Sequence, residues 1–164
     1  MRNVATGSMD TSFSSPFPLD NGLPPAALLR RAHGFKLDLC HALERIADNL
    51  PDNIDRMECL RIANILAPSI RQIHACEEKH IFTAYAAVLA ASADADMETL
   101  RRLKAEHVED QCFADEVTET LLGIGHGQAI DNAEAVGFML RGFFETMRRH
   151  IAFERAHILP ILDR

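Results

Sequence analysis

The chain lacks the features of several common functional classes. It contains no tryptophan and one tyrosine, and its formal net charge is −7. Lys and Arg are not concentrated in any segment, so the electrostatic footprint of a nucleic-acid-binding protein is missing. No apolar run approaches the roughly 20 residues that are needed to cross a membrane. These absences predict that neither a nucleic acid nor a membrane is a partner.

Disulfide and secretory patterns are missing as well. Four cysteines, none in a C-x-x-C pair, occur at Cys40, Cys59, Cys76 and Cys112. Each lies in a helical pattern among apolar neighbours, which indicates reduced thiols. The first 24 residues are rich in Ser, Pro, Gly and Asn and lack the apolar segment of a secretory signal. We therefore expect a cytoplasmic protein with a flexible arm at residues 1–24.

Apolar residues recur at intervals of three and four through four long stretches, whereas the alternating pattern of strands is absent. The stretches span about Pro25 to Leu50, Ile54 to Ala90, Met97 to Leu122 and Asn132 to Leu162. Pro68 predicts a kink or break in the second stretch, and Asp96 is the expected N-cap of the third. Long helices with short links predict an all-α fold, an up-down-up-down four-helix bundle over residues 25–164.

Each predicted helix places one histidine in the middle of its apolar stripe, namely His33, His74, His107 and His150. Glu78 and Glu154 follow the second and fourth of these by one turn, so an imidazole and a carboxylate share a helix face. Glu77 directly precedes Glu78, and a register in which Glu77 faces the core stays open. A lone His followed by His-x-x-x-Glu occurs twice, with gaps of 41 and 43 residues, which indicates a duplicated helix pair.

Carboxylates and imidazoles that converge in a core need compensation, because a buried carboxylate costs several kcal/mol unless it is paired or coordinated. The cations near the His-Glu pairs are expected to face elsewhere, and they are Arg71, Lys79, Arg148, Arg149 and Arg155. Metal ions are the simplest compensation, and imidazole with carboxylate suits iron, manganese or zinc. Six ligands suit two octahedral ions with two carboxylate bridges and an oxo or hydroxo bridge, which leaves positions open for a small molecule.

Other polar residues near the predicted ligands have supporting roles. Asp110 and Gln111 follow His107 by about one turn, so either can orient an imidazole from behind, as metal sites commonly require. His157 lies two turns beyond His150 and is expected to border the cavity or to cap the bundle rather than to act as a ligand.

The order of these motifs, together with the segment "HIAFERAHILP" at residues 150–160, resembles the hemerythrin-like (HHE cation-binding) family. The segment is similar to that family's recurring ending, H-x-x-x-E-E-x-x-L-F-P. The resemblance covers roughly residues 28–162. It implies a four-helix bundle around a non-haem centre of two iron ions with an oxo or hydroxo bridge. By this resemblance the terminal ligands would be His33, His74, His107 and His150, and the bridging ligands Glu78 and Glu154.

Oxygen-carrying hemerythrins use five histidines, whereas the four here are more similar to the sensor and nitrosative-stress repair members of the family. We therefore expect a di-iron protein that senses or binds a small molecule such as dioxygen or nitric oxide, or iron itself. One alternative is an enzyme that reduces nitric oxide or peroxide or repairs iron–sulfur clusters. Another is a metal-free structural bundle. Binding is favoured over catalysis, and the oligomeric state stays open.

Overall fold

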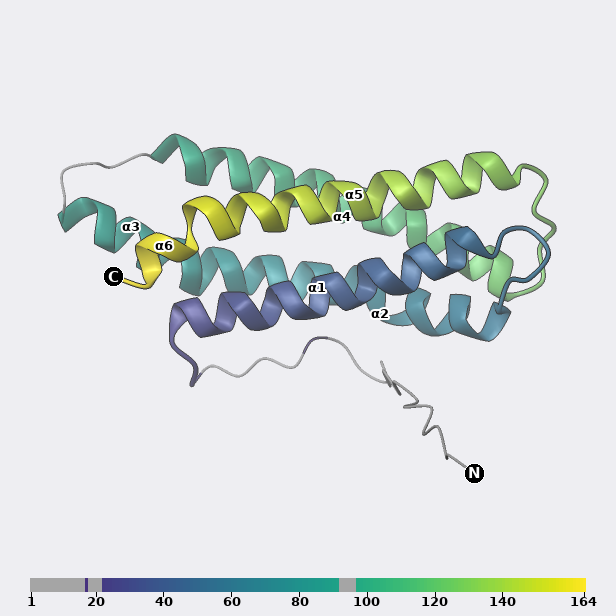
Figure 1. The fold of residues 1–164 in the computed structure, drawn as a ribbon, viewed down its shortest axis with the longest axis horizontal. Coiled ribbons are helices and arrows are strands. Elements are labelled where there is room, and N and C mark those ends of the chain that lie inside the picture. Colours follow the sequence, from purple (N-terminus) through teal and green to yellow (C-terminus); the bar gives the residue numbers. More distant parts are fainter. Residues whose placement is uncertain (1–16, 18–21, 92–96) are drawn as a thin grey trace, which may run out of the picture.

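Four antiparallel helical rods form the protein (Figure 1). The structure is a computed structural model that describes residue 17 and residues 22–91 and 97–164. In chain order its helices are α1 (Pro25–Asp48), α2 (Arg56–Cys76), the π-helix η1 (Glu77–Ile81), α3 (Phe82–Ala91), α4 (Met97–Gly125), α5 (Ala133–His157) and the short α6 (Leu159–Leu162). α1 packs mainly against α5, and α2 packs mainly against α4. This is the predicted all-α, up-down-up-down four-helix bundle.

Local sequence signals set the helix ends. α1 begins at Pro25, where a missing N–H costs no helical hydrogen bond. The Asp55 carboxylate caps α2 by accepting from two backbone N–H groups of the first turn, at 2.9 and 3.0 Å. The Asn132 side chain caps α5 in the same way, at 2.9 Å. The predicted cap Asp96 lies outside the described residues.

The second rod, predicted as a helix from about Ile54 to Ala90 with a kink or break at Pro68, is interrupted elsewhere. α2 continues through Pro68 without a break. Pro68 and Asn64, whose carbonyl loses its helical partner, are both exposed, so water can replace the missing hydrogen bond. The irregularity comes later, at η1, where i→i+5 hydrogen bonds replace the α-helical ones. This π-helix begins at Glu77, three residues after His74.

Two apolar clusters fill the interior, one toward each end of the bundle. The larger contains Leu43 and Phe143, and the smaller contains Leu29 and Leu103. Between them along the rods lies a polar layer whose members are at most 3% exposed: His33, Lys36, His74, Glu77, His107, Asp110, His150 and Glu154. The apolar clusters therefore isolate this layer from solvent at both ends. Among the described helices, none is both long and apolar enough to cross a membrane.

Phe17 belongs to the predicted arm, and it packs onto the bundle. Phe17 is 2% exposed and meets the ring of Phe35 edge-on, with 5.4 Å between the ring centroids. Its backbone N–H donates to Ser69 Oγ at 3.3 Å. Residue 17 thus lies against both α1 and α2.

Two phenylalanines of α5 test which face of this helix stabilises the fold. Phe143 is 2% exposed, whereas Phe138 is 82% exposed. Phe143→Ala should lower the free energy of unfolding by about 3 to 5 kcal/mol, because it leaves a cavity in the larger apolar cluster. Phe138→Ala should change it by about 0.5 kcal/mol or less. Urea denaturation of both variants measures the difference, and equal effects would contradict this packing of α5.

Candidate metal centre

Five of the six residues predicted as metal ligands are buried in the polar layer. They come from α1, α2, α4 and α5, and they are His33, His74, His107, His150 and Glu154. The sixth, Glu78, lies at the margin of the layer, with its side chain 38% exposed. Its neighbour Glu77 is 1% exposed and points into the bundle. The layer therefore contains Glu77 where the predicted set has Glu78.

The π-helix and two contacts explain why Glu77 rather than Glu78 faces inward. Around an ideal α-helix both residues lie within about 60° of His74, so sequence spacing does not choose between them. η1 begins at Glu77 and alters the register from that residue onward. The Glu77 carboxylate then meets the Lys36 ammonium at 2.7 Å and the His107 ring at 3.2 Å. The register that places Glu77 in the core is the one that the protein adopts.

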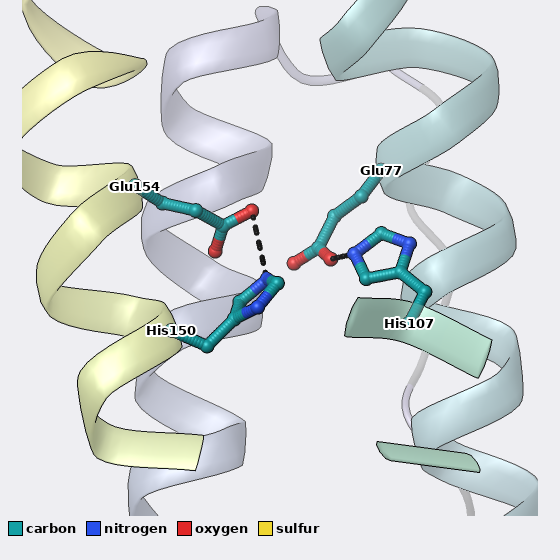
Figure 2. A group of neighbouring side chains, drawn as sticks. All are labelled: Glu77, His107, His150 and Glu154. Atoms are coloured by element: carbon teal, nitrogen blue, oxygen red, sulfur yellow. Dashed lines mark ion pairs between the residues drawn. The ribbon is translucent and has the colours of Figure 1, made fainter. Parts of the chain in front are cut away.

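Four side chains from three rods converge on one point (Figure 2). Glu77, His107, His150 and Glu154 each place a donor atom within 4.8 Å of those of the other three. His107 Nε2 lies 3.2 Å from Glu77 Oε2, and His150 Nε2 lies 3.5 Å from Glu154 Oε1. The His74 ring stacks on the His107 ring, with 3.9 Å between centroids. A cation placed among these atoms would contact ligands from η1, α4 and α5.

The donor atoms that face this point have no hydrogen-bond partners in the described protein. They are Glu77 Oε2, His107 Nε2, His150 Nε2 and Glu154 Oε1, and His74 Nε2, outside the convergent group, also has no partner. A buried polar atom left without a partner costs about 1 to 3 kcal/mol, so a natural core does not normally gather several of them. Imidazole nitrogens and carboxylate oxygens are ligands of iron, manganese and zinc. The residues present therefore fit a metal ion.

Each inward-facing imidazole is held from behind through its other nitrogen. His107 Nδ1 bonds to Glu78 Oε1 at 2.9 Å, which gives Glu78 an orienting role. His150 Nδ1 bonds to Glu106 Oε2 at 3.1 Å and lies 3.9 Å from an Asp110 oxygen. A carboxylate at Nδ1 keeps the proton on that nitrogen, so the Nε2 lone pair faces the centre.

The remaining imidazole has an amide behind it. His74 Nδ1 lies 3.3 Å from the Gln111 side-chain nitrogen. Gln111 therefore contacts a ring on a different helix from its own, in the supporting role predicted for it. Rotation of the amide by half a turn would present its oxygen and let it accept from Nδ1–H.

Lys36 is the residue of the centre that the sequence analysis missed. It is 0% exposed, and its Nζ lies 2.7 Å from Glu77 Oε1 and 3.3 Å from Glu154 Oε2. His33 Nε2 contacts the same Glu154 oxygen at 2.9 Å. The signal was present in the sequence, because Lys36 follows His33 by three residues and so lies on the same helix face.

The charges of the centre shift one another's pKa values. Burial would raise the pKa of Glu77 and Glu154, but the Lys36 ammonium and the adjoining imidazoles hold both below their ordinary range, Glu154 well below it. Burial would lower the pKa of Lys36, yet the two carboxylates raise it. Burial, aided by the neighbouring His107, lowers the pKa of His74. At neutral pH the centre therefore combines two carboxylates, one ammonium and a neutral His74 with a lone pair to offer.

His157 stands apart from the centre. It is exposed at the end of α5, and its ring packs against Phe153, with 4.4 Å between centroids. It is absent from the group of convergent donors. His157 thus covers part of the bundle surface, in line with the expectation that it is not a ligand.

A buried set of imidazoles and carboxylates from several rods of a four-helix bundle defines a helical cation-binding domain. The family model of the hemerythrin HHE cation-binding domain matches residues 25–162. The chain therefore belongs to this family, which confirms the resemblance seen in its motifs. Comparisons with curated proteins and with solved structures found no match.

The neighbouring glutamates Glu77 and Glu78 provide a matched test of the centre. Glu77→Gln removes a charged donor from the convergent group while keeping its size, so stoichiometric binding of Fe²⁺ or Zn²⁺ should be lost. Glu78→Gln removes only the group behind His107 and should weaken binding by about 10- to 100-fold. Competition titration against a metal-sensitive dye measures both, and circular dichroism checks that each variant is folded. A larger loss from Glu78→Gln would contradict this arrangement.

Proposed function

We propose that this protein is a non-haem iron protein whose buried centre binds a small molecule, such as dioxygen or nitric oxide, as a sensor does. One observation carries the proposal: unpartnered imidazole and carboxylate donors converge in a core that is otherwise apolar. Family membership supports a cation as the missing partner. The donors suit iron, manganese or zinc, and the resemblance to the hemerythrin-like family favours iron with a diatomic ligand.

Glu77, Glu154, His107 and His150 would hold the ion, with His74 beside them. Such mixed oxygen and nitrogen donor sets suit iron, and four or five protein ligands would leave two or one of six coordination positions open. Iron held here would supply a redox-active Lewis acid for a small ligand. The protein's own part is to fix the imidazoles through Glu78 and Glu106, to balance charge and to keep bulk water away from the donors.

A surface cavity offers a small molecule access to one side of the centre. Its volume is about 280 Å³, and it lies between α4 and α5. Its lining consists of Arg102, Glu106, Glu109, Asp110, Thr146, Arg149 and His150. His150 belongs both to this lining and to the convergent donors, so the cavity reaches one of the proposed ligands.

Lys36 favours a second candidate, a metal-free structural bundle. Its ammonium already compensates part of the charge of Glu77 and Glu154 without a metal. In that case the histidines would serve only as packed core residues. The two candidate functions differ in whether a metal ion stabilises the fold, so an experiment that adds and removes metal can distinguish them.

Loading with ferrous iron under anaerobic conditions tests the proposed centre. Elemental analysis should find iron bound stoichiometrically to the chain, and its optical spectrum should change when air or nitric oxide is admitted. The Glu77→Gln variant serves as the control, because it should neither retain iron nor show the spectral change. Protein that binds no iron under these conditions would contradict the proposal.

Metal removal tests the structural candidate. An ion that binds only the folded state stabilises it by about 2.7 kcal/mol when its free concentration is about 100 times its dissociation constant. For a domain of this size that corresponds to a rise of roughly 5 to 10 °C in the melting temperature. Calorimetry with Zn²⁺ and then with excess chelator should show this rise and its loss. An unchanged melting temperature would favour the metal-free bundle.

A further inference from the structure

A lysine occupies the interior of the centre, which is an unusual place for an amine among metal-binding side chains. Lys36 is fully buried, whereas the other two lysines, Lys79 and Lys104, are exposed. A lysine is almost never fully buried unless its charge is paired. Here the pairing partners are the two carboxylates of the proposed metal site.

The oxygens of these carboxylates divide into two sets. Glu77 Oε1 and Glu154 Oε2 face the Lys36 ammonium, at 2.7 and 3.3 Å. Glu77 Oε2 and Glu154 Oε1 face the imidazoles of His107 and His150 and have no hydrogen-bond partner. A carboxylate that bridges two cations gives one oxygen to each of them. Both glutamates are arranged as bridges, and one of the two bridged cations is the ammonium.

His33 belongs to the ammonium side of the centre. Its Nε2 lies 2.9 Å from Glu154 Oε2, the oxygen that Lys36 also contacts. A carboxylate oxygen that faces an ammonium is a hydrogen-bond acceptor, so His33 Nε2–H donates to it. That nitrogen is therefore occupied by a proton rather than available to a metal. His33 is buried with the predicted ligands but uses its ring differently from His107 and His150.

We propose that Lys36 takes the place of one metal ion, so that the centre binds a single divalent ion between Glu77, Glu154, His107 and His150. The inference rests on the proposed metal-binding function and specifies its stoichiometry. Two carboxylates and one ammonium give a net charge of −1. One divalent ion changes the charge of these three groups to +1, whereas a second would change it to +3, and uncompensated buried charge costs several kcal/mol.

The internal repeat shows where this asymmetry comes from. Lys36 follows the lone His33 by three residues, and Asp110 follows the lone His107 by the same number. Three residues after its lone histidine, the first half of the repeat thus carries a cation, Lys36, and the second half carries an acid, Asp110. Lys36 contacts both carboxylates, while Asp110 lies 3.9 Å from the outer nitrogen of His150. The repeat supplies two related positions, and only the position next to His107 is left for a metal.

Metal stoichiometry of matched lysine variants tests the proposal. The full-length protein and the variants Lys36→Met and Lys104→Met are each loaded with Fe²⁺ anaerobically, and iron per chain is measured by elemental analysis. We expect one ion in the unmodified protein, two in Lys36→Met and one in Lys104→Met, whose lysine is exposed on α4.

The outcomes separate this inference from the proposed function. Two ions in the unmodified protein would overturn the inference and leave the iron-binding function standing. No bound ion would overturn the function and the inference together. A single ion in both the unmodified protein and Lys36→Met would show that Lys36 does not exclude the second ion.

A second measurement requires no variant, in case Lys36→Met does not fold even when it is refolded with Zn²⁺. With three lysines in the chain, the ¹⁵N spectrum of selectively labelled protein is simple. The Lys36 ammonium should give a slowly exchanging signal both before and after addition of one equivalent of Zn²⁺. Loss of this signal on addition of Zn²⁺ would show that the metal displaces the lysine and would overturn the proposal.

Discussion

Glu77 and Glu154 carry their carboxylates into the middle of a helical bundle, where an uncompensated charge would cost several kcal/mol. The other features of the centre follow from this constraint. Lys36 approaches both carboxylates from α1, and the imidazoles of His107 and His150 face their remaining oxygens. The apolar clusters on either side of the polar layer keep water from hydrating the buried carboxylates. A cation is a species that this arrangement could hold.

The centre has a closed side and an open side. On the closed side, Lys36 and His33 satisfy one oxygen of Glu154, and Lys36 also satisfies one oxygen of Glu77. On the open side, unpartnered donors gather next to His150, which also lines the cavity between α4 and α5. A bundle built from a duplicated helix pair would be expected to treat its two halves alike. Here the two halves differ, because Lys36 occupies in the first half the position that Asp110 occupies in the second.

The support around the centre spans several elements. Glu78 on η1, Glu106 on α4 and Gln111 on α4 each contact the outer nitrogen of an imidazole from another rod. Such contacts fix ring orientation and tautomer, on which metal affinity depends. The π-helix η1 is part of this support, because Glu77 at its start enters the core while the next residue stays behind His107. Irregular backbone in the second rod thus serves the site rather than the fold.

The sequence by itself determined the helices, their order, the family and the histidines of the polar layer, because these depend on local periodicity and on spacing along one helix. Contacts between helices were decided only by the tertiary structure. Spacing along the helix did not decide whether Glu77 or Glu78 faces the core. The π-helix η1, together with contacts from Lys36 on α1 and His107 on α4, places Glu77 there. Lys36 shares a face with His33, yet its pairing with Glu154 joins residues 118 positions apart. Which charges meet in a core depends on how the rods pack, and no pattern within one helix contains that information.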